Sequence, residues 1–171
     1  MSSHSEKSGF VSAFIGTGAG IASTVYGTVV VMATLTAAYA TEKDPWRLAV
    51  LVWTTAFVLW VAHLYSHGLA ESISRRRRLS WGELTDIAHR ELGILLAAAV
   101  PSAALLLGAI GALRESRAVW LALAAGLVTL AAEGLRYARI ETLGRTATLT
   151  IVAANLAVGL LVVLLKVTIA H

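Results

Sequence analysis

The sequence predicts an all-α fold, a membrane bundle of five transmembrane helices, and three observations carry this prediction. The 171 residues are 57% hydrophobic and 14% charged, whereas a soluble domain carries about 25% charged residues. The apolar residues gather into five stretches, each close to the roughly 20 residues that a helix needs to cross a bilayer. Most links between the stretches are short, so consecutive helices are expected to run antiparallel as neighbours.

The five expected spans can be placed along the chain from their apolar residues. They cover approximately residues 19–40, 46–70, 92–113, 118–138 and 147–170. Pro45 directly precedes the second span, where its missing N–H group costs no helical hydrogen bond. The polar residues 1–9 are expected to form a mobile tail. Residues 10–171 are expected to form a single transmembrane domain.

Composition also excludes several classes of protein. The apolar content argues against a soluble globule and a disordered chain. The chain has no cysteine, which removes disulfides, thiolate nucleophiles and sulfur-ligated metals. The net charge is +4, but most basic residues lie between the apolar stretches. We therefore expect these charges to set membrane orientation, and we expect neither a nucleic-acid partner nor a cofactor.

Charge asymmetry predicts the orientation of the bundle. With the N-terminus in the cytoplasm, the inner segments hold nine of the 14 Lys and Arg residues and the outer segments hold five. The positive-inside rule then favours an N-in, C-out topology. The bias toward Ala, Leu, Gly and Arg suggests a bacterial source, so the expected location is the bacterial cytoplasmic membrane.

The longest link, residues 71–91, carries its own helix signal on the cytoplasmic side. Ser80 followed three residues later by Glu83 is a capping-box pattern. A helix that begins after Ser80 places four apolar side chains on one face: Trp81, Leu84, Ile87 and Ala88. We interpret this link as a short amphipathic helix in the inner headgroup layer. Five of its residues are expected to contact lipid headgroups: Arg75, Arg76, Arg77, Arg78 and Trp81. The alternative is that the arginines only set orientation and solubility.

Four spans place a polar side chain at a similar depth. These side chains are Tyr26, His63, Glu133 and Asn155. Counted along the helices, each lies roughly 4–8 Å to the cytoplasmic side of the midplane. Polar groups inside a bilayer are costly unless they find partners or water, so this shared depth is the main functional signal in the sequence.

The second span extends this polar layer toward the cytoplasm. His63, His67 and Glu71 are spaced four residues apart, so they form one stripe on the helix. On the fourth span, Glu133 and Arg136 are three residues apart, and we expect them to form an ion pair. A chain from Glu133 through the two histidines to Glu71 would be a proton or cation pathway.

Two other interpretations of these residues stay open. His63 and His67 could hold a metal ion together with a carboxylate, although the residue after His63 is Leu64 rather than the glutamate of a metalloprotease motif. Alternatively, the histidines bridge helices by hydrogen bonds, and Arg136 neutralises Glu133 in a purely structural network.

The leading functional hypothesis is a small bacterial inner-membrane channel or transporter subunit for protons or a monovalent cation. Five helices enclose little internal space, so a permeation path would require a homo-oligomer. The first alternative is a non-catalytic scaffold or regulatory subunit of a larger membrane complex. The second is an intramembrane metal-dependent enzyme. No residue is assigned a catalytic role, and a non-enzyme is favoured.

Overall fold

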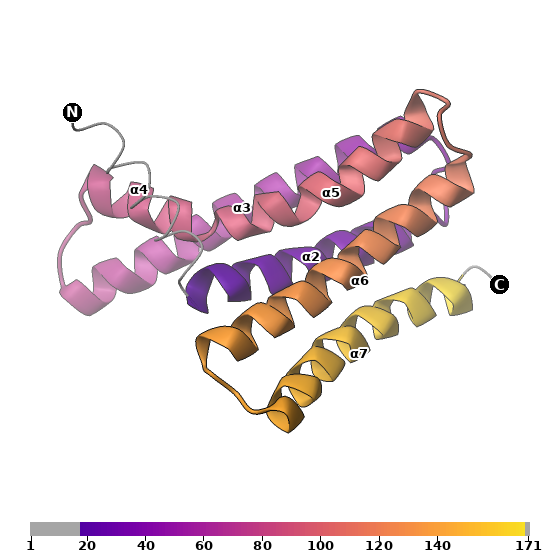
Figure 1. Cartoon of the computed structure of the whole chain (residues 1–171). Coiled ribbons are helices and arrows are strands. Elements are labelled where there is room, and N and C mark those ends of the chain that lie inside the picture. The colour runs from indigo at the N-terminus through magenta and orange to yellow at the C-terminus, as the bar shows by residue number, and fades with distance from the viewer. Residues whose placement is uncertain (1–17, 170–171) are drawn as a thin grey trace, which may run out of the picture.

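The computed structural model describes residues 18–169, and the polar segment 1–9 lies outside this range. The described residues form six helices and no strand (Figure 1). Their bounds are α2 Gly18–Ala38, α3 Pro45–Arg75, α4 Trp81–Arg90, α5 Leu92–Ala109, α6 Glu115–Ile140 and α7 Arg145–Ile169. Five helical segments in this part of the chain are long and apolar enough to span a membrane. The predicted all-α fold with five such helices is therefore confirmed, while its orientation stays a prediction.

Four helices, α3, α5, α6 and α7, pack side by side in a row, and α2 packs against all four. Along the row, α3 packs on α5, α5 on α6, and α6 on α7, while α2 contacts each of these four helices. In Figure 1, α2 lies between α3 on one side and α6 with α7 on the other. The core is formed mainly by large apolar side chains of α2, α3, α5 and α6, among them Met32, Leu35, Leu48, Leu105, Leu123 and Leu130.

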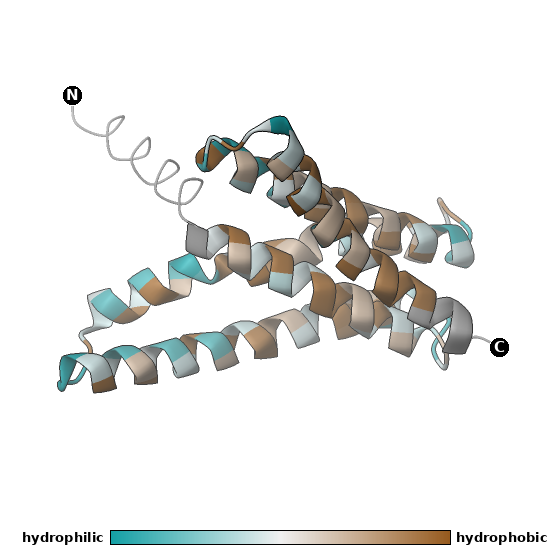
Figure 2. Cartoon of the chain, turned by 90° about the horizontal axis from the view of Figure 1, so that it is seen from below, coloured by the Kyte–Doolittle hydropathy of each residue, from teal (hydrophilic) through white to brown (hydrophobic). Residues whose placement is uncertain are grey.

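Helices α2 and α5 approach each other closely because glycines face the contact. A Cβ atom added at Gly27 would lie 2.8 Å from the Cα atom of Ile94, and one added at Gly93 would lie 2.6 Å from the hydroxyl oxygen of Thr24. Inside a bilayer, burial of apolar surface does not hold helices together, and close packing at small residues stabilises their association instead. Apolar residues cover most of the bundle in Figure 2, and hydrophilic residues gather toward helix ends and along the projecting α3–α4 hairpin.

Two helix ends differ from the sequence expectation. The second span was expected to end near Ala70, but α3 continues to Arg75 and ends with Arg76 in the left-handed conformation, φ 52°. The third span was expected to reach residue 113, but α5 ends at Ala109, and Gly111 follows with φ 77°. Loss of apolar character marks the edge of the membrane, whereas a helix ends where the backbone changes conformation.

The link between the second and third spans forms a helical hairpin with α3. Helix α4 begins after Ser80, and the predicted capping box with Glu83 is present. The apolar face of α4 packs on α3: Ile87 is buried, and a Cβ atom at Gly68 would lie 3.5 Å from Leu84. Trp81 instead points outward and is 84% exposed. The contact at Gly68 lies within the expected second span, and the continuation of α3 to Arg75 adds an ion pair with Glu83 of α4. The hairpin projects beyond the other helices (Figures 1 and 2).

Candidate functional site

The centre of the candidate site is Glu91, which lies at the break between α4 and α5. Glu91 closes α4 as its C-cap and precedes the first residue of α5. It is only 4% exposed, and it is the one buried residue with an ionisable side chain among those for which burial is described. A carboxylate removed from water is strongly destabilising unless hydrogen bonds satisfy its oxygens. The two contacts described next provide these hydrogen bonds.

Glu91 joins three helices through its two carboxylate oxygens. The buried hydroxyl of Ser23, on α2, donates to Oε2 over 2.6 Å. The ring nitrogen Nδ1 of His67, on α3, lies 2.8 Å from Oε1. The side chain of His67 is 55% exposed, whereas that of Glu91 is 6% exposed. The pair therefore connects a buried carboxylate to an imidazole that surrounding molecules can reach.

Two further side chains, His63 on α3 and Tyr26 on α2, extend this group of contacts. The rings of His67 and His63 meet edge to face with centroids 5.8 Å apart. The ring of His63 lies 4.9 Å from that of Tyr26 on α2. We call these five side chains the relay cluster: Ser23, Tyr26, His63, His67 and Glu91. The cluster lies where α2, α3 and the α4–α5 break come together.

The hydrogen bonds constrain where protons reside in the relay cluster. Nδ1 of His63 lies 3.1 Å from the carbonyl oxygen of Leu59, and a carbonyl only accepts, so Nδ1 carries the hydrogen and Nε2 is the free acceptor. Between His67 and Glu91, one proton is shared across the 2.8 Å contact: either the imidazole donates to a carboxylate, or a carboxylic acid donates to the imidazole. This contact can therefore hold a proton on either partner.

The other polar residues of the predicted layer form a separate group on α6 and α7. Glu133 pairs with Arg136 over 3.3 Å. The side-chain amide of Asn155 donates to the carbonyl oxygen of Leu130 over 3.1 Å, which ties α7 to α6. Helix α2 separates this group from α3. The structure thus brings Tyr26 and the two histidines together and places Glu133 and Asn155 in other contacts.

Glu71 also lies outside the relay cluster. Its carboxylate pairs with Arg75 over 2.7 Å, at the C-terminal end of α3. His67 turns to Glu91 across the helix interface rather than to Glu71 along its own helix. The histidine stripe therefore contacts Glu91, and Glu71 contacts Arg75 instead.

Sequence reasoning missed Ser23 and Glu91 for a physical reason. Glu91 stands at the junction of a polar link and an apolar stretch, where a charged residue is ordinary. Ser23 is one small polar residue within an apolar run, which by itself predicts nothing. Their meeting depends on which faces of α2 and α5 touch, and the only hint in the sequence was the pair of glycines, Gly27 and Gly93, that permit that contact.

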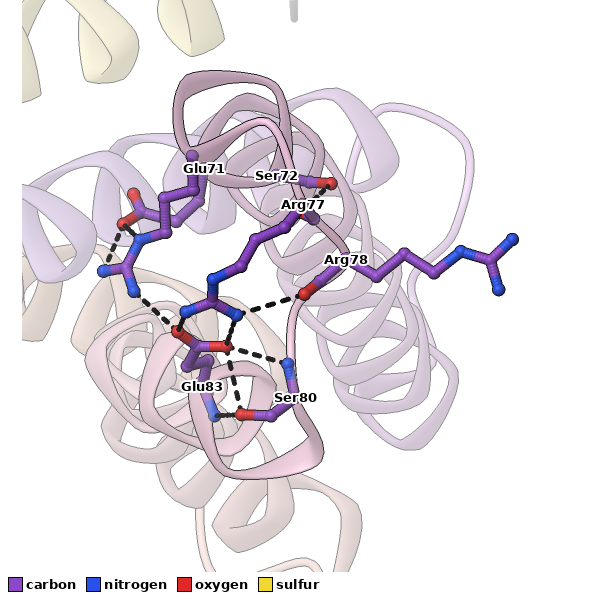
Figure 3. Close-up of polar contacts among 7 residues, drawn as sticks. Glu71, Ser72, Arg77, Arg78, Ser80 and Glu83 are labelled. Atoms are coloured by element: carbon purple, nitrogen blue, oxygen red, sulfur yellow. Dashed lines mark hydrogen bonds and ion pairs between the residues drawn. The ribbon is translucent and has the colours of Figure 1, made fainter.

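The arginine run at the tip of the α3–α4 hairpin comprises residues 75–78. Arg75 and Arg77 form ion pairs with Glu83 of α4. Glu83 lies 2.6 Å from guanidinium nitrogens of both Arg75 and Arg77, and it also accepts the backbone N–H of Ser80 over 2.8 Å. Figure 3 shows Glu83 between Arg77 and Ser80, with the guanidinium of Arg78 pointing away. The hydrogen bonds from Arg77 to Glu83 raise the pKa of Arg77 above its ordinary value. We call the contacts of Glu83 with Arg75, Arg77 and Ser80 the tip clasp.

The metal-site alternative gains no support from these contacts. Within the described residues, no group of three or more His, Asp or Glu side chains is arranged to hold a metal ion. Nδ1 of His67 faces Glu91, and Nδ1 of His63 faces a backbone carbonyl. Within the part of the chain that the structure describes, the two histidines are not joined by the third protein ligand that zinc sites normally have.

Comparison with known proteins adds no further constraint. The chain matches no protein-family model, and it matches neither a curated protein nor a solved structure. The relay cluster and the membrane-like architecture that holds it are therefore the features of the molecule that bear on its function.

Proposed function

We propose that this chain is a small channel or transporter subunit of the bacterial cytoplasmic membrane and that it handles protons. The contact between His67 and Glu91 would be its proton-binding site. The observation that carries the proposal is a buried carboxylate whose hydrogen-bonding partner, His67, is more than half exposed. Ionisable residues inside membrane proteins typically mark ion or proton pathways.

The chemistry of the cluster favours protons over a monovalent metal cation. A hard cation takes several oxygen ligands, whereas the cluster offers one carboxylate that Ser23 and His67 already occupy. Histidine changes its charge near neutral pH. The contact between His67 and Glu91 supplies two groups that can exchange a proton across one hydrogen bond.

The geometry suggests an order of proton transfer. A proton arriving from water binds the exposed ring of His67 and can pass across the 2.8 Å contact to Glu91. Ser23 holds the other carboxylate oxygen in place. His63 and Tyr26 continue the cluster along α3 and α2, and Tyr26 is 46% exposed at the surface of the bundle. We propose that a second copy of the chain completes the path there.

Proton flux in liposomes tests the proposal. The purified full chain is reconstituted in vesicles that contain a pH-sensitive dye, and a potassium gradient with valinomycin supplies the driving voltage. We expect wild type to carry protons and Glu91→Gln and His67→Gln to abolish the flux, because both amides keep hydrogen-bonding groups but do not titrate. The matched control is His89→Gln, which replaces an exposed histidine on α4.

The outcome is interpreted only for variants that fold. Gel-filtration profile and thermal unfolding in detergent must match those of wild type. Unchanged flux in a folded Glu91→Gln or His67→Gln variant would contradict the assignment of the site. Absence of flux in wild type would contradict transport by the chain alone, and co-purification with a larger complex would then favour the scaffold alternative.

A further inference from the structure

An exposed apolar stripe runs along α3 from the bundle to the hairpin tip. Its members are four residues apart, so each is next to the following one on the helix surface and the stripe winds slowly around α3: Phe57, Val61, Tyr65, Leu69 and Ile73. Toward the tip, Tyr65 is 72% exposed and Ile73 is 68% exposed. Helix α4 covers a different side of α3, so the stripe stays open along its whole length.

The length of α3 places the tip at the level of lipid headgroups. Trp46 lies at the start of α3, where an exposed tryptophan suits the membrane interface. The 27 residue steps from Trp46 to Ile73 span about 40 Å at 1.5 Å per residue. A bilayer is about 30 Å thick in its hydrocarbon and about 40–45 Å thick with its headgroups. Ile73 therefore falls in the opposite headgroup layer rather than in free solution.

Two arginines at this level have no acidic partner among the described residues. Arg75 and Arg77 are engaged in the tip clasp, whereas Arg76 and Arg78 are exposed and form no ion pair within residues 20–164. The guanidinium of Arg78 points away from Glu83 (Figure 3). Trp81, 84% exposed, follows three residues after Arg78. Uncompensated positive charge thus stands beside exposed aromatic and aliphatic side chains.

We propose that the α3–α4 hairpin is a binding site for anionic phospholipid. Ile73 and Trp81 lie in the headgroup layer next to the tops of the acyl chains, and Arg76 and Arg78 bind headgroup phosphates. A lipid surface fits better than a protein partner because the stripe continues the apolar outer face of α3, including Phe57 and Val61 within the expected span. Basic side chains at such a surface are attracted to anionic leaflets, and tryptophan prefers the interface.

Quenching of Trp81 fluorescence tests this proposal in bilayers. Full-length protein is placed in nanodiscs of phosphatidylcholine that contain a minor fraction of either phosphatidylglycerol or phosphatidylcholine brominated near the top of the acyl chains. The difference between wild type and Trp81→Phe isolates the signal of Trp81. We expect brominated phosphatidylglycerol to quench this signal more strongly, with a relative affinity higher by roughly fivefold for each arginine involved.

Matched charge variants separate the two kinds of arginine. The double variant Arg76→Asn with Arg78→Gln should erase the preference for phosphatidylglycerol, because asparagine tolerates the left-handed conformation at position 76. The control Arg114→Gln with Arg117→Gln removes two exposed charges at the other end of the bundle, and it should leave the preference unchanged.

Three results would overturn the proposal. They are equal quenching by both lipids in wild type, no quenching of Trp81 by either lipid, and an undiminished preference in the folded Arg76/Arg78 variant. The second result would place Trp81 in water or against a protein. Folding is checked by gel filtration. Neither substitution removes a side chain of the tip clasp. None of these measurements depends on proton flux, so the lipid site and the proposed function can fail separately.

Discussion

At the scale of single residues, the sequence predicts depth in the membrane but not direction around a helix. Tyr26, His63 and His67 were expected to share a site, and the structure brings them together. Glu133 has a similar expected depth, yet it pairs with Arg136 on the far side of α2. Depth follows from counting 1.5 Å per residue, whereas direction depends on which helices become neighbours, and that is decided by packing between distant segments.

The hydroxyl of Ser23 offers a test of the site that does not depend on function. Ser23→Ala removes the donor 2.6 Å from Oε2 of the buried Glu91. We expect a loss of about 1–3 kcal/mol in unfolding free energy, the usual penalty for an unsatisfied buried polar group. Equilibrium unfolding in mixed detergent measures it. Ser74→Ala, at an exposed position on α3, is the control, and equal stability of the two variants would contradict this account of Glu91.

At the scale of elements, local signals predicted helix starts better than helix ends. The pattern Ser80-x-x-Glu83 predicted the start of α4 because the cap is made by residues three apart in sequence. Hydropathy placed the end of the second span near Ala70, but α3 continues for five more residues. Four of those five residues are polar, and the segment is still helical, with Arg75 bonded to Glu71 and Glu83 there. The ion pair between Arg75 and Glu83 of α4 could not be predicted without that extension.

The tip clasp should determine how tightly the hairpin loop is held. Glu83→Gln removes the charge that Arg75 and Arg77 share over 2.6 Å contacts. We expect the loop at residues 76–80 to open more often and trypsin to cut after its arginines severalfold faster. Cleavage is followed by mass spectrometry of the protein in detergent.

The comparison variant for the clasp is Asp86→Asn, which removes an exposed carboxylate from the same helix. It should be cut at the wild-type rate. If Glu83→Gln is cut no faster than Asp86→Asn, the ion pairs of Glu83 contribute nothing to the order of the loop.

At the scale of the whole molecule, composition and apolar length were sufficient to predict five membrane-spanning helices. The order of helices in space was not predictable in the same way. Helix α2 packs against four others, whereas α7 packs mainly on α6 and α2. This arrangement depends on close contacts at glycines, such as Gly126 against Met32. Small residues are so frequent in this chain that their spacing alone does not show which of them meet.

Orientation is the whole-molecule property that charge counting predicts and that labelling can test. Single cysteines are introduced into this cysteine-free chain at Ser74 and at Ser116, exposed positions at opposite ends of the bundle. With an N-in topology, a membrane-impermeant thiol reagent added to intact cells should label Ser116→Cys and not Ser74→Cys. Permeabilised cells, in which both must react, provide the control. The reverse pattern would show that the N-terminus faces outward.

The arrangement around Glu91 also bears on how the protein is made. Both of its hydrogen-bonding partners, Ser23 and His67, precede it in the chain. Since a ribosome delivers residues in sequence order, α2 and α3 have already been synthesised when this carboxylate emerges. The acid therefore never has to wait for a later segment before its oxygens can be satisfied, and the order of translation matches the order in which the junction can assemble.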